Sequence, residues 1–282
     1  MTESITARSH QHGDLPLLRT LRAPAQWRQI DFISDLHLHV ADQATFAAWQ
    51  AYMQATTAQA VFMLGDLFEV WVGDDVLAST DPEAPDNAFV LSCVHTLRQA
   101  SERLDLFFLC GNRDFLVGPQ GLQASAMQGL TDPCVLELGA ARWLLSHGDA
   151  LCLDDVAYQQ FRARVRGPAW QSEFLAQPLA QRQATARQMR LQSEQLKRSC
   201  PVLVDVDNDA ASAWMTDADT HVLIHGHTHQ PADHPLADGR RRIVLSDWDL
   251  QAKPPRAQVL RVELSASGQP LACSRLTPAL AC

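Results

Sequence analysis

Five short segments of the chain combine metal-binding side chains with a glycine or serine, and each follows an apolar run. In chain order they read Ser34-Asp35-Leu36-His37, Gly65-Asp66, Gly111-Asn112-Arg113-Asp114, Ser146-His147-Gly148-Asp149 and Gly226-His227-Thr228-His229. Together they offer carboxylate, amide and imidazole ligands without a thiolate, which is more than one tetrahedral zinc ion accepts. This set suits a pair of divalent ions such as Mn²⁺, Fe²⁺ or Zn²⁺. Two such ions can generate a hydroxide that is a strong nucleophile for in-line attack on phosphorus.

The elements that carry these segments are predicted to be strands. Apolar runs of strand type cover residues 30–35, 60–64, 106–110, 136–138, 143–146 and 221–224, and further strand signals cover 242–245 and 259–264. Helical spacing covers residues 46–53 and a stretch that ends near 103. Because ligands gather at the carboxyl ends of strands in open α/β sheets, the segments are expected to converge. The alternation favours a layered α/β domain with two sheets.

A long segment between the fourth and fifth motifs differs from the rest of the chain. Residues 154–199 are rich in Gln, Ala and Arg, and their helical pattern is broken at Gly167-Pro168 and Pro178. The segment is locally basic and carries apolar residues such as Phe161, Trp170 and Phe174. It predicts either a lid that shelters acyl chains near an anionic partner or a helical pair packed on the core. Residues 1–27 are polar without a period and are expected to form a loosely ordered extension of a domain that spans 28–282.

Composition excludes several classes of protein. The 282 residues are 46% apolar and 20% charged, as in ordinary soluble proteins. A net charge of −9 argues against general nucleic-acid binding, so no nucleic-acid partner is expected. The seven cysteines form no C-x-x-C pair, which favours reduced thiols in the cytoplasm. The first residues lack the apolar core of a secretory signal, and no run approaches 18 apolar residues.

The order D-x-H, G-D, G-N-x-D, H-G-D, G-H-x-H resembles that of the calcineurin-like metallophosphoesterases. This resemblance implies a two-sheet α/β/β/α sandwich. It also implies two metal ions, most simply two Mn²⁺, with Fe²⁺ or Zn²⁺ as alternatives. One ion would be held by Asp35, His37 and His229 and the other by Asn112, His147 and His227, with Asp66 bridging the two.

Longer runs resemble one branch of that superfamily, the UDP-2,3-diacylglucosamine pyrophosphohydrolases of lipid A biosynthesis. The runs are Gly65 to Asp75, Gly111 to Leu116, His147 to Asp155 and Ile224 to Pro231. The resemblance implies hydroxide attack on the α-phosphorus of UDP-2,3-diacylglucosamine, which releases UMP and 2,3-diacylglucosamine 1-phosphate (lipid X). It further implies a cytoplasmic enzyme that associates peripherally with the inner membrane. The implied catalytic residues are Asp66 and Arg113, and the implied substrate contacts are Asn112, Arg113, Asp155, Ser193, Lys197 and His227.

Arg113 follows the metal-binding Asn, at a place where many metallophosphoesterases carry a histidine that protonates an alkoxide leaving group. An arginine stays charged and is a poor proton donor. Cleavage of a pyrophosphate expels a phosphate monoester, which needs little help from a general acid. Arg113 is therefore expected to clamp phosphate oxygens, and the alternative is a pairing of Arg113 with Asp114.

Departures from the branch and two rival functions complete the sequence-based picture. The branch usually carries an Asn and a Lys after the position of Ser193; Lys197 aligns with that Lys only across a gap, and Ser246-Asp247-Trp248-Asp249 differs from the usual Gly/Ala-Trp-His. One rival is another metal-dependent phosphodiesterase or phosphatase of the same fold. The other is a non-catalytic scaffold, although such proteins lose ligands and this chain keeps all seven.

Overall fold

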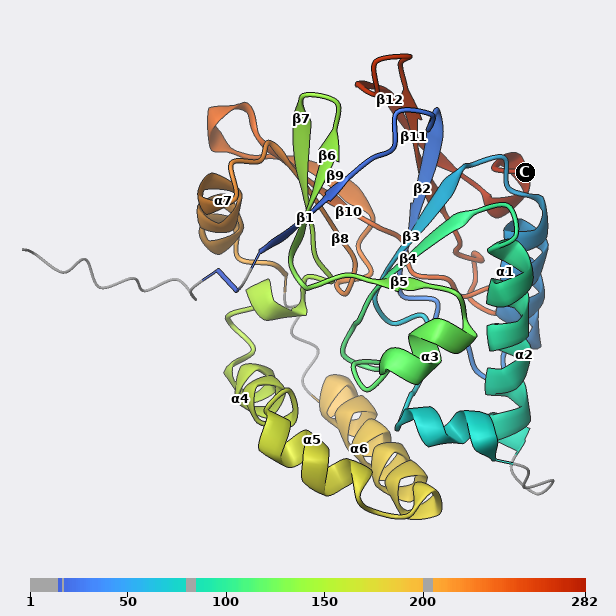
Figure 1. The fold of residues 1–282 in the computed structure, drawn as a ribbon. Coiled ribbons are helices and arrows are strands. Elements are labelled where there is room, and N and C mark those ends of the chain that lie inside the picture. The colour runs from blue at the N-terminus through green and yellow to red at the C-terminus, as the bar shows by residue number, and fades with distance from the viewer. Residues whose placement is uncertain (1–14, 17, 80–84, 200–204) are drawn as a thin grey trace, which may run out of the picture.

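Two six-stranded sheets form the centre of the molecule (Figure 1). The computed structural model describes residues 15–16, 18–79, 85–199 and 205–282, and for residues 192–199 it gives the backbone alone. The first sheet has the order β1 (Arg19–Arg22), β6 (Cys134–Leu138), β7 (Ala141–Leu145), β8 (Val222–His225), β10 (Arg241–Val244) and β9 (Ala232–Pro235). The second has the order β12 (Pro270–Leu276), β11 (Val259–Leu264), β2 (Gln29–Ile33), β3 (Ala60–Leu64), β4 (Asp105–Leu109) and β5 (Gln128–Gly129).

The sheets pack face to face over an aromatic and aliphatic core. Phe32, Phe62 and Phe107 come from three adjacent strands, and their rings stack with centroids 4.9 and 4.6 Å apart. They meet Leu136 and Ile224 of the other sheet. Because side chains alternate along a strand, the residues between these point to the outer faces, which must be covered as well.

Helices cover both outer faces. The helices α1 (Gln43–Ala55), α2 (Pro85–Ala100) and α3 (Pro119–Ala124) lie on the side of the second sheet, where Trp49, Tyr52 and Leu97 join Ile33 and Met63 in one core cluster. Helix α7 (Asn208–Asp217) covers the first sheet. The layers therefore run α/β/β/α, and the predicted two-sheet sandwich is confirmed.

The strands predicted from apolar runs are present with shifts of one or two residues at their ends, whereas β1, β5, β9 and β12 were not predicted. Strand β1 lies inside residues 1–27, for which the sequence suggested only a loosely ordered extension, and it pairs in parallel with β6. Three of its four residues are exposed, so no apolar period marks it. Trp27 is buried in the core between the sheets, so this part of the chain belongs to the domain.

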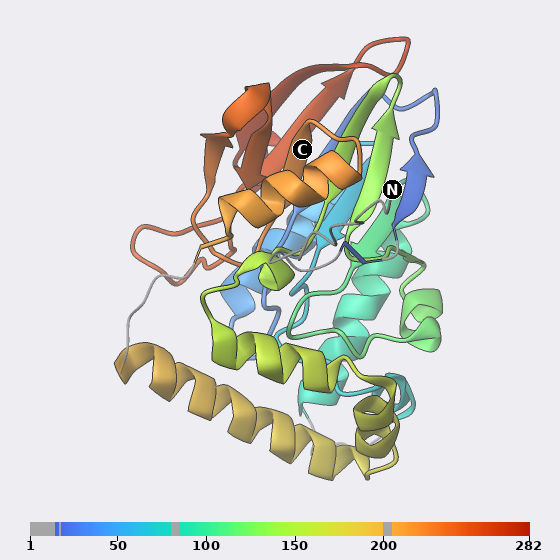
Figure 2. The ribbon, with the colours of Figure 1, turned by 90° about the vertical axis from the view of Figure 1, so that its left-hand side faces the viewer.

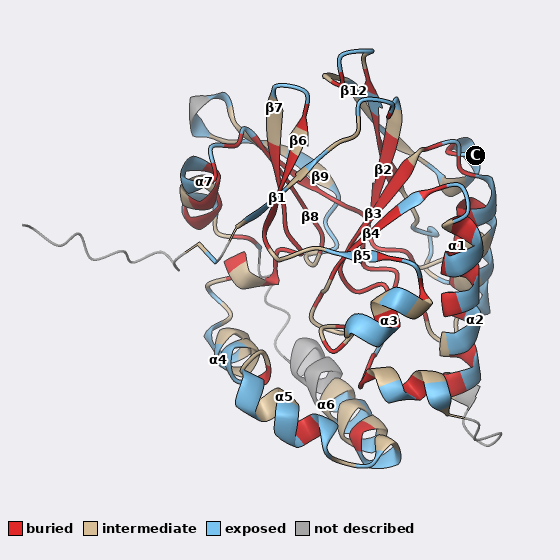
Figure 3. Cartoon of the chain, in the orientation of Figure 1, coloured by how far each residue is buried: buried red, intermediate tan, exposed pale blue. Residues whose placement is uncertain are grey.

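Three helices project beyond the carboxyl ends of the central parallel strands, and together they are called the helical arm (residues 156–199). They are α4 (Val156–Val165), α5 (Pro168–Leu175) and α6 (Leu179–Ser199), with breaks at the predicted Gly167-Pro168 and Pro178. Figure 2 shows the helical arm lying apart from the sheets, and Figure 3 shows many exposed residues along α4 and α5. No helix in the described residues is both long enough and apolar enough to cross a membrane.

Candidate metal centre and active site

Five of the predicted metal ligands have left-handed backbone conformations. The φ angles are 54° for Asp35, 48° for His37, 52° for Asp66, 69° for His227 and 55° for His229. Residues other than glycine rarely adopt positive φ, and such strain concentrates at functional sites. Each of these residues follows the end of a β-strand, so the left-handed turn redirects its side chain as the chain leaves the sheet.

Glycines allow the loops to pack against one another. A Cβ atom placed on Gly111 would clash with the Asp66 carboxylate, and one placed on Gly226 would clash with Asp35. The glycines of these two motifs are thus needed for close approach rather than for chain flexibility.

The first ligand group comprises Asp35, His37 and His229. Their ligand atoms all lie within 4.8 Å of one another. Nε2 of His229 is 3.3 Å from Oδ1 of Asp35 and 3.4 Å from Nε2 of His37. The Asp35 carboxylate also accepts hydrogen bonds from the backbone N–H of His227 and the hydroxyl of Ser34, which fix its orientation.

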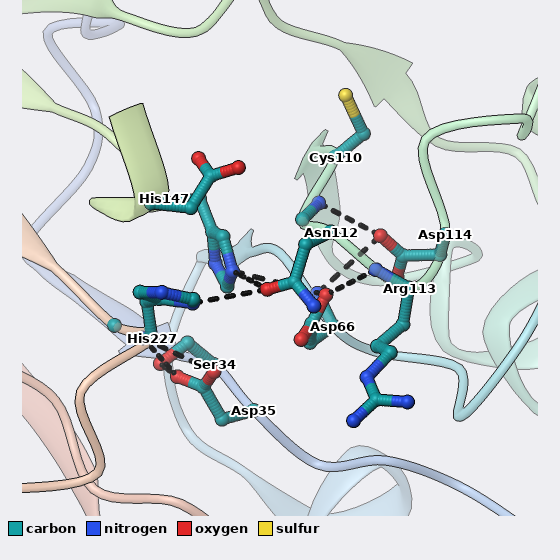
Figure 4. Close-up of polar contacts among 12 residues, drawn as sticks. Ser34, Asp35, Asp66, Cys110, Asn112, Arg113, Asp114, His147 and His227 are labelled. Atoms are coloured by element: carbon teal, nitrogen blue, oxygen red, sulfur yellow. Dashed lines mark hydrogen bonds and ion pairs between the residues drawn. The ribbon is translucent and has the colours of Figure 1, made fainter. Parts of the chain in front are cut away.

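The second group gathers around the side-chain oxygen of Asn112 (Figure 4). This oxygen lies 3.0 Å from Nε2 of His147 and 3.0 Å from Nδ1 of His227. Nδ1 of His147 lies 3.0 Å from the Leu64 carbonyl and donates to it, so Nε2 is left to face the site. Ligand atoms of His147 also lie within 4.8 Å of Asp35 and Asp66.

Asp66 lies between the two groups. Its Oδ2 is 3.8 Å from Nε2 of His37, and its Oδ1 is 3.8 Å from Nε2 of His147. Asp35 is also shared, because it belongs to both sets of atoms that lie within 4.8 Å. The structure thus brings all seven predicted ligands together. The carboxylates of Asp66 and Asp35 are shared between the two groups, and two neighbouring cations would need such shared negative charge.

The electrostatics of the site favour bound positive charge. Burial acts to lower the pKa of His147, but the carboxylates of Asp66, Asp35 and Asp149 raise it to about 9. Burial and the charge of His147 lower the pKa of His227 to about 3, which keeps its ring neutral, as metal ligation requires. Burial alone would raise the pKa of Asp35, yet its hydrogen bond to His229 and nearby histidine charges hold it well below the usual range. A cluster of carboxylates and imidazoles is a donor set that divalent ions fit.

Comparison with known proteins agrees with this geometry. Residues 28–231 match the family model described as calcineurin-like phosphoesterase. The chain belongs to this family.

Curated relatives of this phosphoesterase cover most of its length. A UDP-2,3-diacylglucosamine hydrolase from Bordetella pertussis is 42% identical over 82% of the chain and 90% of the relative. Proteins of the same name from Chromobacterium violaceum and Serratia proteamaculans are 42% and 40% identical, over 78% and 83% of the chain and 90% and 96% of the relatives. The matched region is long enough to include both ligand groups and the helical arm.

Two acidic residues lie next to predicted metal ligands of the phosphoesterase, and neither was assigned a role from the sequence. Oε2 of the buried Glu69 lies 3.2 Å from Nδ1 of His37. Asp247 lies 3.7 Å from Nδ1 of His229 and accepts hydrogen bonds from Nε and Nη2 of Arg256, at 3.0 and 2.7 Å. Glu69 stands three residues after Asp66 in a motif run, and Asp247 stands in a segment noted only as a departure, so sequence position alone gave little signal.

Arg113 is placed by two contacts. Its backbone N–H donates to Oδ1 of Asp66 at 2.8 Å, and its NH1 lies 3.4 Å from Oε1 of Glu69. Asp114 instead accepts backbone N–H groups, among them those of Gly111 and Leu67 at 2.7 and 2.8 Å, so it ties the second and third motifs together. In Figure 4 the guanidinium of Arg113 points away from Asp114. The pairing of Arg113 with Asp114 considered from sequence is therefore not what holds this side chain.

The predicted substrate contacts in and beside the helical arm stay predictions. Asp155 caps α4 by accepting from the backbone N–H of Tyr158 at 2.9 Å, which is a structural contact. Ser193 and Lys197 lie in α6, but their side chains are outside the described residues. Several basic residues of the arm have intramolecular partners. Arg162 and Arg166 face Asp149, and Arg182 contacts Asp75 and the Val72 carbonyl.

A cleft of 550 Å³ opens at the first ligand group, with His37 and His229 in its lining. It runs past the first group toward the loop that holds Asp247 and Arg256, and Arg113 and Arg190 line it on the side of α6. Nε of Arg190 lies 3.1 Å from Oε1 of Glu69. An anionic substrate entering this cleft would meet the guanidinium groups of Arg113 and Arg190 beside the predicted metal ligands.

Proposed function

We propose that the phosphoesterase hydrolyses the pyrophosphate bond of UDP-2,3-diacylglucosamine to UMP and 2,3-diacylglucosamine 1-phosphate. The observation that carries this proposal is the 42% identity to a curated UDP-2,3-diacylglucosamine hydrolase across 90% of the relative's length. The cleft supports it, because two arginines stand beside a cluster of metal ligands, where a pyrophosphate needs charge compensation.

Asp35, His37 and His229 would hold one divalent ion, and Asn112, His147 and His227 the other, with Asp66 between them. We assign Mn²⁺ to both positions, and Fe²⁺ or Zn²⁺ would accept the same oxygen and nitrogen donors. When bound, a pair of divalent ions supplies an activated water and positive charge beside phosphorus. The residues themselves preorganise this arrangement, since the hydrogen bond from His227 N–H to Asp35 and that between Leu64 and His147 fix ligand directions before substrate arrives.

Arg113 would bind phosphate oxygens of the substrate and stabilise the charge that develops during attack on the α-phosphorus. Its backbone is fixed to Asp66, so its guanidinium starts from a position next to the ligand groups. Glu69 holds that guanidinium and the one of Arg190 on the same side of the cleft. The leaving group is a phosphate monoester, so a permanently charged arginine suffices where other reactions need a proton donor.

The helical arm would shelter the acyl chains and rest on the inner face of the membrane that contains the substrate. Val156, Leu175 and Leu191 are exposed apolar side chains of this arm, at 60%, 42% and 59% exposure. Exposed apolar side chains close to basic residues suit a peripheral contact with anionic lipid. Other apolar side chains of the arm, such as Trp170 and Phe174, pack on the core instead.

Product analysis tests the reaction. The purified protein with Mn²⁺ is given UDP-2,3-diacylglucosamine and, separately, UDP-N-acetylglucosamine, which shares the nucleotide but lacks the acyl chains. We expect UMP from the diacylated substrate only, and in water enriched in ¹⁸O we expect the label in UMP. Label in lipid X would contradict attack on the α-phosphorus, and rapid turnover of a simple aryl phosphate without a lipid requirement would favour a broader phosphoesterase.

A further inference from the structure

Helix α4 of the helical arm is attached to the segment that ends at Asn112. The guanidinium of Arg166 donates to the Gly111 carbonyl at 2.9 Å and lies 3.0 Å from the sulfur of Cys110. It also lies over the ring of Phe115, 4.9 Å from the ring centroid. These contacts flank Asn112 on both sides in the sequence, so Arg166 fixes the loop that presents the Asn112 oxygen.

The same helix is attached to the loop of His147 through Asp149, which is completely buried. One carboxylate oxygen of Asp149 accepts from the Tyr158 hydroxyl at 2.6 Å and from Nε of Arg162 at 2.8 Å, and NH2 of Arg166 is 3.8 Å away. The backbone carbonyl of Asp149 accepts from the Gln159 amide at 2.7 Å. A buried carboxylate needs such partners, so the loop after His147 depends on α4.

Tyr158 also links α4 to the third ligand of the second group. Its ring lies 5.8 Å from that of His227, with an angle of 31° between the two planes. One helix thus backs Asn112, His147 and His227 together. The first ligand group has different supports, since Glu69 contacts His37 and the Asp247–Arg256 pair stands behind His229.

We infer that α4 is a structural part of one metal position, with Arg166 as the main positioning residue for the group of Asn112, His147 and His227. Loosening this helix should weaken one ion and spare the other, because the two groups are supported by separate elements. The inference rests on the metal assignment of the proposed function. Outer contacts of this kind typically change metal affinity by about 10–100-fold when removed.

The test is a calorimetric titration of the full chain with Mn²⁺ alone, which requires no substrate. We expect two bound Mn²⁺ for the wild type. For Arg166→Gln we expect one ion at the wild-type affinity and one weakened by about 10–100-fold. In the electron paramagnetic resonance spectrum, the variant with one equivalent of Mn²⁺ should show an isolated ion, whereas filling both positions should produce a coupled pair.

Arg182→Gln is the matched control, because Arg182 is another arginine of the helical arm whose guanidinium has partners in the rest of the domain. Its partners are Asp75 and the carbonyls of Val72 and Gln177, not the loops of the second group. We expect this variant to bind both ions at wild-type affinity. Equal loss of one ion in Arg182→Gln would overturn the inference, because any loosening of the arm would then have the same effect.

Tyr158→Phe provides a second route should Arg166→Gln fail to fold by circular dichroism. It removes one hydrogen bond to Asp149, so we expect a several-fold weakening of the same single ion. If Arg166→Gln folds and still binds two Mn²⁺ at wild-type affinity, the inference is overturned and the proposed reaction stands. If only Tyr158→Phe folds, the same result in that variant has the same meaning. A wild type that binds fewer than two Mn²⁺ would overturn the metal assignment and the inference together.

Discussion

Oε2 of Glu69 lies 3.2 Å from Nδ1 of His37, so a buried carboxylate stands directly behind a proposed metal ligand. Burial acts to raise the pKa of Glu69, but the contact with His37 and the charges of Arg113 and Arg190 lower it to about 2. Glu69 therefore remains ionised. It orients the imidazole so that Nε2 points toward Asp66, at 3.8 Å.

Glu69→Gln should preserve the size of this side chain and remove its charge. We expect a reduction of about 10–100-fold in Mn²⁺ affinity or in kcat/KM, because the imidazole loses its orienting carboxylate. The measurement is kcat/KM as a function of Mn²⁺ concentration. An unchanged Mn²⁺ dependence in this variant would remove Glu69 from the support of His37.

Asp66→Ala should abolish hydrolysis and leave the fold in place. Asp66 is the carboxylate between the two ligand groups, and it lies just after β3 rather than inside it. The far-ultraviolet circular dichroism spectrum and the melting temperature report the fold, and UMP release reports the activity. Wild-type turnover by Asp66→Ala would exclude the proposed role of this residue.

Arg113→Ala should lower kcat by roughly 10²-fold, because a preorganised positive charge is removed from the developing transition state. Arg113→Lys is the comparison, since a lysine keeps the charge but cannot bind two phosphate oxygens with one planar group. We expect partial recovery with lysine. Equal kcat values for the alanine variant and the wild type would show that Arg113 does not act on the substrate.

Asp31→Ala should destabilise the protein without touching the active site. The buried Asp31 carboxylate accepts hydrogen bonds from Nε and NH2 of Arg261, each at 2.8 Å, and from the Tyr52 and Thr56 hydroxyls at 2.9 Å. Removal of one partner leaves a buried, uncompensated charge, which typically costs about 3–5 kcal/mol. Urea unfolding measures the loss, and a change below about 1 kcal/mol would contradict the importance of this pair. Activity per folded molecule should stay near that of the wild type.

The sequence was sufficient for the parts of the site that follow apolar strands. Asp35, Asp66, Asn112, His147 and His227 each stand just beyond a buried run, and chain order plus strand-end geometry places them together. The breaks between the helices of the arm were also predictable, because Gly167-Pro168 and Pro178 interrupt a helical pattern.

The parts that were not predictable depend on partners distant in the chain. Strand β1 is mostly exposed, and its existence depends on the edge that β6 offers. The sequence alone indicates a basic segment without acidic partners. Asp149 and Asp75, which pair with Arg162, Arg166 and Arg182, stand outside the helices that carry these arginines. Similarly, the role of Asp247 emerges only when the loop after β10 folds back against His229.

Strand β2 has one neighbour made soon after it and another made much later. It pairs with β3 in parallel and with β11 in antiparallel, and Arg261 of β11 follows Asp31 by 230 residues. On a ribosome that adds roughly 5–20 residues per second, this interval lasts roughly 10–50 s. During that time the nascent chain carries Asp31 without Arg261, and for most of it the first ligand group lacks His229. The first residues of the active site are therefore made well before the residues that complete it, and one edge of β2 stays unpaired until β11 is made.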